Sequence, residues 1–101
     1  MNELVEKVEK WSSDKGLHES DPKSQFLKVA EEFGEIGAAM ARNDDHELKD
    51  AIGDVIVTLI ILAQQNGTDV ETCLAQAYGE ISGRKGKLVD GVFIKSSDLD
   101  E

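Results

Sequence analysis

The amino-acid sequence predicts an all-α domain of four helices with a short β-prone segment near the C-terminus. Apolar residues recur with a helical period along most of the chain, and there is a single Pro in 101 residues. This length is enough for one domain with a modest core. We therefore expect residues 1–95 to form a single domain and residues 96–101 to form a flexible acidic tail.

The first two helices are expected over residues 2–14 and from Pro22 to about Arg42. Gly16 is typical of the end of a helix, and Pro22 suits a first helical turn. The second helix carries a regular apolar stripe, which we expect to be buried. Its members are Phe26, Val29, Ala30, Phe33, Ile36, Gly37 and Met40.

A third helix is expected from about His46 to Gln65, capped by Asp44 or Asp45. Its second half, residues 55–63, is apolar nearly all round and must be covered on every side. A chain of this size can hardly do that alone, so we expect a homo-oligomer, at least a dimer, built around this helix. A fourth helix, capped by Thr68 or Asp69, should follow and run to about residue 82. Residues 92–94 are β-prone and suit an edge strand or hairpin.

Composition and charge narrow the function. The formal net charge of −10, with no basic stripe, argues against nucleic acid as a partner. The longest apolar stretch is about half a membrane span, and the N-terminus does not resemble a signal peptide, so we expect a soluble, cytoplasmic protein with no membrane partner. Cys73 has no second cysteine to pair with, and its apolar neighbours favour a small core residue.

The chemistry of the sequence lies in two pairs of acidic residues. Glu32 and Glu35 are spaced i, i+3 in the second helix, and Asp50 and Asp54 are spaced i, i+4 in the third. Each pair therefore lies on one face of its helix, beside an apolar stripe. Four carboxylates between two packed helices would repel one another unless a cation neutralised them, and Mg²⁺ prefers oxygen ligands. The competing interpretation is an exposed acidic surface.

Around these residues the sequence resembles the MazG-type, all-α nucleoside triphosphate pyrophosphohydrolases. The family carries a Glu-Glu-x-x-Glu motif on one helix and a Glu-x-x-Asp motif on the next. The first appears in this chain as Glu31-Glu32-Phe-Gly-Glu35, and the second should lie in residues 48–57. Residues 77–95 look like the end of the short MazG-like proteins common in bacteriophages, so a host cytoplasm is implied if the chain is phage-encoded. The resemblance covers roughly residues 8–95.

One position departs from the family pattern. Three residues before Asp54, where the family has Glu, this chain has Ala51. Asp50 can take over, because i and i+4 also share a helix face. A literal Glu-x-x-Asp exists one turn earlier, as Glu47 and Asp50. We favour Asp50 with Asp54, since Gly53-Asp54-Val55 leading into an apolar run matches the family context better.

The resemblance implies hydrolysis of a nucleoside triphosphate between the α and β phosphates, giving the monophosphate and pyrophosphate. Mg²⁺, with Mn²⁺ as an alternative, would be held by Glu32, Glu35, Asp50 and Asp54, and Glu31 or Glu35 could orient or deprotonate the attacking water. The remaining expected site residues would bind substrate, through charge or by stacking on the base. These are Lys28, Arg84, Lys85, Lys87, Trp11 and Tyr78.

Three functions remain open from the sequence. The first is a Mg²⁺-dependent nucleoside triphosphate pyrophosphohydrolase, acting as a dimer or a tetramer. The second, motivated by Ala51, is a nucleotide- or metal-binding regulator that hydrolyses slowly. The third is a helical interaction module whose acidic residues are only surface charge.

Overall fold

The computed structural model describes residues 2–98 of the chain. These residues form four α-helices, two short 3₁₀ helices and one two-stranded antiparallel sheet, which agrees with the mostly helical fold predicted from the sequence. In chain order the elements are α1 (Asn2–Asp14), η1 (Leu17–Glu19), α2 (Pro22–Ala41), α3 (Asp45–Gln65), α4 (Val70–Ile81), β1 (Gly86–Val89), β2 (Val92–Lys95) and η2 (Ser96–Asp98).

Aspartate side chains start three of the helices. Asp21 precedes Pro22 at the start of α2, Asp44 begins α3, and Asp69 begins α4. Each carboxylate accepts a hydrogen bond from a backbone N–H in the first turn that would otherwise lack a partner. Of the alternative caps expected from the sequence, Asp44 and Asp69 are therefore the residues used.

The β-prone segment forms a hairpin. Strands β1 and β2 pair in register from Gly86 opposite Lys95 to Val89 opposite Val92. The two turn residues, Asp90 and Gly91, have φ values of 51° and 81°, the pattern of a type I′ turn, which matches the twist of the flanking strands. The expected tail begins with the 3₁₀ helix η2, and its residues 99–101 lie outside the described part of the chain.

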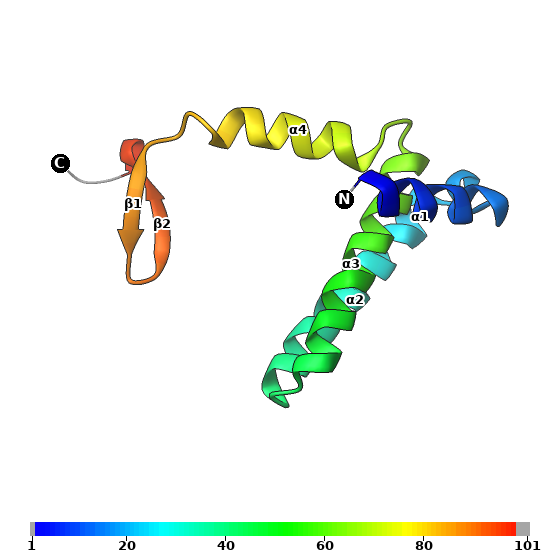
Figure 1. Ribbon diagram of the computed structural model, residues 1–101, viewed down its shortest axis with the longest axis horizontal. Coiled ribbons are helices and arrows are strands. Elements are labelled where there is room, and N and C mark those ends of the chain that lie inside the picture. Colours follow the sequence, from blue (N-terminus) through cyan, green and yellow to red (C-terminus); the bar gives the residue numbers. More distant parts are fainter. Residues whose placement is uncertain (1, 99–101) are drawn as a thin grey trace.

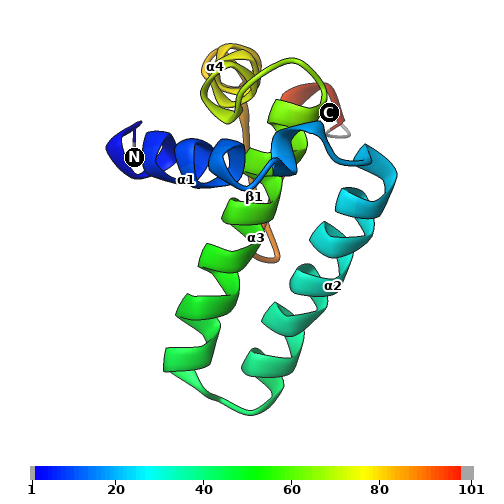
Figure 2. The same ribbon diagram turned by 90° about the vertical axis from the view of Figure 1, so that its right-hand side faces the viewer.

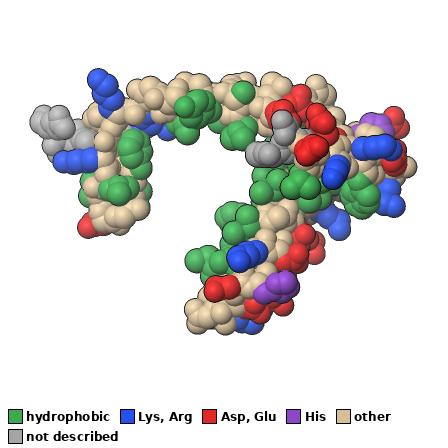
Figure 3. Space-filling model, viewed as in Figure 1, with side chains coloured by type: hydrophobic (Ala, Val, Ile, Leu, Met, Phe, Trp, Pro, Cys, Tyr) green, Lys and Arg blue, Asp and Glu red, His purple; other side chains and the backbone are tan. Residues whose placement is uncertain are grey.

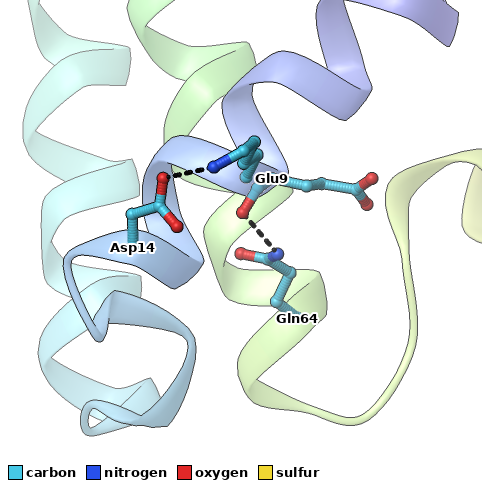
Figure 4. A network of polar contacts seen from close by, with 4 residues as sticks. Glu9, Asp14 and Gln64 are labelled. Atoms are coloured by element: carbon cyan, nitrogen blue, oxygen red, sulfur yellow. Dashed lines mark hydrogen bonds and ion pairs between the residues drawn. The ribbon is translucent and has the colours of Figure 1, made fainter.

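Helices α2 and α3 run antiparallel, and α1 crosses α3 near its C-terminal end (Figure 2). We call residues 2–65, which contain α1, η1, α2 and α3, the body, and three glutamine side chains bond it together. The Nε2 of Gln25 donates to the Thr58 carbonyl at 3.0 Å, and that of Gln65 donates to the Leu17 carbonyl at 2.9 Å. The Nε2 of Gln64 donates to the Glu9 carbonyl at 3.2 Å (Figure 4). The buried apolar residues of the described chain are Val5, Ala39, Ala51, Ile60, Ile61 and Ala63.

The body meets the start of α4 at an acidic junction. Partial burial, and then the nearby carboxylates of Asp69, Glu71 and Glu6, raise the pKa of Glu9 above its ordinary value. In Figure 4 the Glu9 side chain points from α1 toward the loop that leads into α4.

The remainder of the chain extends away from the body. Helix α4 leaves the end of α3 at a steep angle and carries the hairpin at its far end, so that the molecule has the outline of an inverted U (Figure 1). We call residues 70–98 the arm. The radius of gyration is 16.6 Å, against about 13 Å for a compact domain of this length. A single chain is therefore too open to cover its own apolar surface.

Two expectations about burial are wrong for the single chain. Phe26, Phe33 and Met40, expected in the buried stripe of α2, are 60%, 67% and 61% exposed. The face that packs on α3 is displaced by one residue, so these three side chains lie beside the contact and not in it. Cys73, expected in the core, is exposed on α4, which has little to pack against. Within residues 2–98, no helix has both the length and the apolar character needed to cross a bilayer.

Candidate active site

The site is built on the seam between α2 and α3. The Gln25–Thr58 hydrogen bond fixes one end of the antiparallel pair, and the Asp44 N–H donates to the Ala39 carbonyl at the other, 3.1 Å away. Between these points the less exposed residues recur every three or four positions on both helices. These seam residues are Gln25, Val29, Glu32, Ile36 and Ala39 on α2, and Asp44, Leu48, Ala51, Val55 and Thr58 on α3.

The seam divides the surface of the pair into two sides of opposite character. In an antiparallel pair, residues one position after the seam lie on one side and residues one position before it lie on the other. The positions after the seam form an exposed apolar side: Phe26, Phe33, Met40, Ile52, Ile56 and Leu59. The positions before it form an acidic side: Lys28, Glu31, Glu35, Glu47, Asp50 and Asp54.

A cleft of about 250 Å³ opens on the acidic side. Its polar lining consists of four carboxylates and one imidazole, and no Lys or Arg lines it. The lining residues are Glu35, His46, Glu47, Asp50, Ala51 and Asp54. Glu35 of α2 and the Asp50–Asp54 pair of α3 therefore share one cleft, as their spacing along the two helices predicts.

Glu47 also has a partner in its own chain. Its Oε2 accepts a hydrogen bond from Nη2 of Arg42 at 2.7 Å, and both side chains are about half exposed. An exposed pair of this kind contributes little to stability. The guanidinium offsets part of the negative charge at the loop end of the cleft, which leaves Glu35, Asp50 and Asp54 as its uncompensated carboxylates.

The cleft suits a divalent cation by chemistry, though not as a preformed cage. Its donors are mostly carboxylate oxygens, the ligands that Mg²⁺ and Mn²⁺ take up. Within residues 2–98, no three Asp, Glu, His or Cys side chains are grouped closely enough, in the conformations observed, to hold a metal ion. The carboxylates of Glu35, Asp50 and Asp54 belong to exposed residues, so a change of rotamer could turn them toward a common ion.

Ala51 lies at the centre of this arrangement. It is 5% exposed on the seam, and it lines the cleft. The hydrogen bonds described above pair position 25 of α2 with position 58 of α3, and position 39 with position 44. In this antiparallel pair, position 32 of α2 therefore lies opposite about position 51 of α3. A glutamate at position 51 would therefore face Glu32 across the seam, and the alanine leaves Glu32 as the carboxylate at this level. Glu32 is half-buried but does not line the cleft.

The structure does not bring the other expected site residues to the cleft of the same chain. Lys28 and Glu31 lie on its side of α2 but outside its lining. Trp11 is on α1, about half exposed, with Nζ of Lys15 at 5.6 Å from its ring centroid. Tyr78 lies on α4. Arg84, Lys85 and Lys87 lie on the arm, at the base of the hairpin and in β1.

His46 is exposed and lines the cleft, and the sequence analysis did not include it among the expected site residues. The signal was available, because His46, Asp50 and Asp54 are spaced i, i+4 and i+8 and so follow one line along α3. The imidazole adds a nitrogen donor or a proton carrier at the edge of the carboxylate set.

A second polar hollow, of about 580 Å³, lies at the base of the hairpin. It combines three basic side chains with two hydroxyl side chains, a composition suited to oxyanions. Its lining is Glu80, Gly83, Arg84, Lys85, Lys95, Ser96 and Ser97. One of these cations already has an acidic neighbour: the Nζ of Lys95 lies 3.8 Å from Oδ2 of Asp98.

Comparison with known proteins identifies the family. Residues 20–89, which contain both acidic helices and the first strand, match the MazG nucleotide pyrophosphohydrolase domain. The chain belongs to the MazG family. The chain is also 43% identical over 70 residues to an uncharacterized 18.2 kDa protein in the rep-hol intergenic region of Haemophilus phage HP1 (strain HP1c1). That match covers 68% of this chain and 43% of the phage protein, so the chain spans less than half of its relative. No solved structure gives a significant match.

Proposed function

We propose that this MazG domain is a Mg²⁺-dependent nucleoside triphosphate pyrophosphohydrolase that releases a nucleoside monophosphate and pyrophosphate. One observation carries the proposal: Glu35, Asp50 and Asp54 line a single cleft between the two helices that hold the acidic motifs of a MazG domain. Mn²⁺ would serve in place of Mg²⁺, since both accept carboxylate ligands. Glu32, half-buried on the seam beside the cleft, would complete the set of metal ligands.

The carboxylates have two tasks in this reaction. Glu32, Glu35, Asp50 and Asp54 would bind the ion, which, when bound, screens phosphate charge and makes a water molecule more acidic. Glu35, or Glu31 one turn earlier on the same side of α2, would orient that water and accept its proton. The water oxygen forms a new bond to phosphorus, the bond between that phosphorus and the bridging oxygen breaks, and pyrophosphate leaves.

Substrate binding would fall to the remaining residues of the expected site. Lys28 lies on the acidic side of α2, one turn before Glu31, where an ammonium group could reach a phosphate. Trp11 and Tyr78 are exposed aromatic side chains that could stack on a base. We propose that Arg84, Lys85 and Lys87 bind phosphate oxygens.

The protein would act as a homo-oligomer, a dimer or a tetramer of this chain. The support is the apolar side of the α2/α3 pair, where six large apolar side chains are between 38% and 67% exposed in one chain. A face of that composition is typical of an interface between proteins. Light scattering at micromolar concentration should give a dimeric mass or a larger one, and a monomeric mass would exclude this part of the proposal.

A product assay tests the activity. Purified protein with Mg²⁺ is given each common NTP and dNTP, and the monophosphate and pyrophosphate are followed by ion-exchange chromatography. We expect both products, and a loss of more than about 100-fold in turnover for Asp54→Asn and for Glu32→Gln, with helical circular dichroism unchanged. Glu6→Gln, an equivalent change on the exposed face of α1, is the matched control and should keep full activity. Activity that survives Asp54→Asn would overturn the assignment.

A nucleotide-binding regulator is the second candidate, and Ala51 is the observation that favours it. The domain lacks one carboxylate at the buried centre of the cleft, which could weaken metal binding and slow hydrolysis. Calorimetry separates the two functions: nucleotide binding in the presence of Mg²⁺, without release of pyrophosphate over hours, would support the regulator and exclude the enzyme.

A further inference from the structure

The arm has almost no protein around it. Every residue from 71 to 93 is exposed, although α4 carries large apolar side chains at regular helical spacing. Leu74, Tyr78 and Ile81 are spaced i, i+4 and i+7 and are 53%, 64% and 52% exposed. They form one stripe along α4, the pattern of a helix that packs against another surface. Within residues 2–98, no element covers this stripe along its length.

The apolar parts of the arm and of the body face the same space. Figure 3 shows hydrophobic side chains on the side of the α2/α3 pair that faces the arm and on the inner side of the arm itself. Where α3 and α4 meet, these surfaces join in an apolar groove of about 510 Å³, lined among others by Ile56, Leu59, Leu62 and Leu74. The inside of the inverted U therefore carries apolar patches on both of its sides, and they meet in this groove.

The charged side chains of the α2/α3 pair and of the arm lie on different parts of the molecule. In Figure 3 the Asp and Glu side chains of the α2/α3 pair gather on the side that faces away from the arm. The cleft on that side has no Lys or Arg in its lining. Residues 83–95 carry four basic side chains and one acidic one, Asp90, and so have a net charge of +3 in a chain of net charge −10. Apart from Lys28, the cations proposed to bind the phosphates of a nucleotide at these carboxylates lie at the far end of the arm of the same chain.

We propose that a second copy of this chain fills the space beneath the arm, and that each arm carries Arg84, Lys85 and Lys87 to the acidic cleft of the other copy. The two α2/α3 pairs would pack through their apolar sides about a twofold axis. Rotation by 180° about that axis turns the acidic side of one pair, which faces away from its own arm, toward the partner's arm. The role of the cations in phosphate binding rests on the proposed function, whereas the crossing of the arms does not.

This arrangement accounts for features that a single chain leaves unexplained. It covers Phe26, Phe33 and Met40 on α2 and the Leu74 stripe on α4 in one step. It brings a segment of charge +3 to a cleft lined by four carboxylates. Each active site is then incomplete without the partner, because the carboxylates come from one copy and the phosphate-binding cations from the other.

Subunit complementation tests the crossing of the arms. One chain carries Asp54→Asn with a normal arm, and the other carries Arg84→Gln, Lys85→Gln and Lys87→Gln with a normal cleft. Each is inactive or weak as a homodimer. The two are co-expressed with different tags, and the mixed dimer is purified through both tags. We expect it to recover about half of the wild-type turnover, because one of its two sites combines a normal cleft with a normal arm. Activity that stays at the mean of the two parent homodimers would overturn the proposal.

Two controls keep the result specific. Lys7→Gln with Lys23→Gln removes two exposed cations from the body and should leave turnover unchanged. If the triple arm variant keeps wild-type kcat/KM as a homodimer, the cations have no role and the proposal is wrong.

A second measurement does not depend on activity, so it separates failure of this inference from failure of the proposed function. Chains labelled with ¹⁵N are mixed with unlabelled chains, and a carbodiimide joins lysines to nearby carboxylates without a spacer. We expect cross-links from Lys85 or Lys87 to Glu47, Asp50 or Asp54 in which one peptide is labelled and the other is not. Cross-links confined to peptides with the same label, or no cross-link between these segments, would overturn the crossing even in an active enzyme.

Discussion

The body and the arm differ in how much of their apolar surface they bury. The body is residues 2–65 and the arm is residues 70–98. The body buries Ile60 and Ile61 and ties α1, α2 and α3 together through glutamine side chains that bond to backbone carbonyls. The arm has helix caps and a well-formed hairpin turn but almost no burial. Regular secondary structure therefore does not require a core in the same chain. The body should be stable by itself, and the arm should depend on what it packs against.

The largest effect should follow from adding charge to the α4 stripe. Leu74→Glu with Tyr78→Glu would place four carboxylates in a symmetric dimer interface where apolar groups had been buried. At about 1.5–3 kcal/mol for each lost side chain, the dimer Kd should rise by more than about 1,000-fold. The mass measured by light scattering should fall to that of one chain, and α4 amides should then exchange hydrogen rapidly while α3 amides stay protected.

Leu4→Glu is the matched control for that change. Leu4 is an exposed leucine on α1, 69% accessible and outside the arm. Its substitution should leave the mass unchanged. If the double arm variant keeps the oligomeric mass of the wild type, α4 is not part of the interface.

A smaller effect is expected from the core of the body. Ile60 of α3 is 2% exposed, and Ile60→Ala should cost about 2–5 kcal/mol of the free energy of unfolding, through lost transfer energy and a cavity. Leu4→Ala, at an exposed position, should change it by less than about 0.5 kcal/mol. Denaturant unfolding followed by circular dichroism gives both values. Equal losses for the two variants would show that α3 is not the centre of the core.

The smallest expected effect is on the pH dependence of stability, through the aspartates that cap the helices. Asp21 caps a helix of the body and Asp69 caps the helix of the arm. The Thr72 backbone N–H and hydroxyl hold the pKa of Asp69 below its ordinary 3.8, and the Ser24 hydroxyl with the Lys23 N–H does the same for Asp21. A carboxyl whose pKa is lowered by folding contributes stability above its unfolded pKa and loses it as the pH falls from about 3.8 through the lower folded value.

Asp21→Asn should therefore reduce the acid sensitivity of global unfolding, and Asp69→Asn only that of α4. Thermal scans between pH 5 and pH 2.5 report the first, and hydrogen exchange at the Thr72 amide reports the second. A change of global stability with pH that is the same in both variants would show that α4 unfolds together with the body.

Much of this architecture could be predicted from the sequence because its signals are local. Asp44 and Asp69 were among the expected helix caps, and the β-prone residues 92–94 lie in strand β2. Strand β1 was not predicted, because residues 86–89 carry two of their four positions as Gly and Lys and give a weaker β signal. The i, i+4 spacing of Asp50 and Asp54 correctly placed both on one face, and the cleft contains them. The same rule applied to His46 would have added it.

Long-range features could not be predicted from these signals. Helix α2 carries two adjacent apolar stripes of the same period, and periodicity cannot say which of them faces α3. The chain uses the stripe of Val29, Ile36 and Ala39, with the polar Gln25 and Glu32 included in the seam. Similarly, the sequence placed Arg84 and Lys85 among the substrate contacts, while their separation from the carboxylates of the same chain depends on the direction in which α4 leaves α3.

Binding of a divalent cation tests the central claim, that the acidic side of the α2/α3 pair is a metal site. Mn²⁺ is titrated into the protein and the free ion is measured by electron paramagnetic resonance. The account predicts saturable binding of at least one Mn²⁺ per chain, weakened more than about tenfold by Asp54→Asn and unaffected by Glu6→Gln. Binding of equal affinity in the wild type and in Asp54→Asn would contradict it.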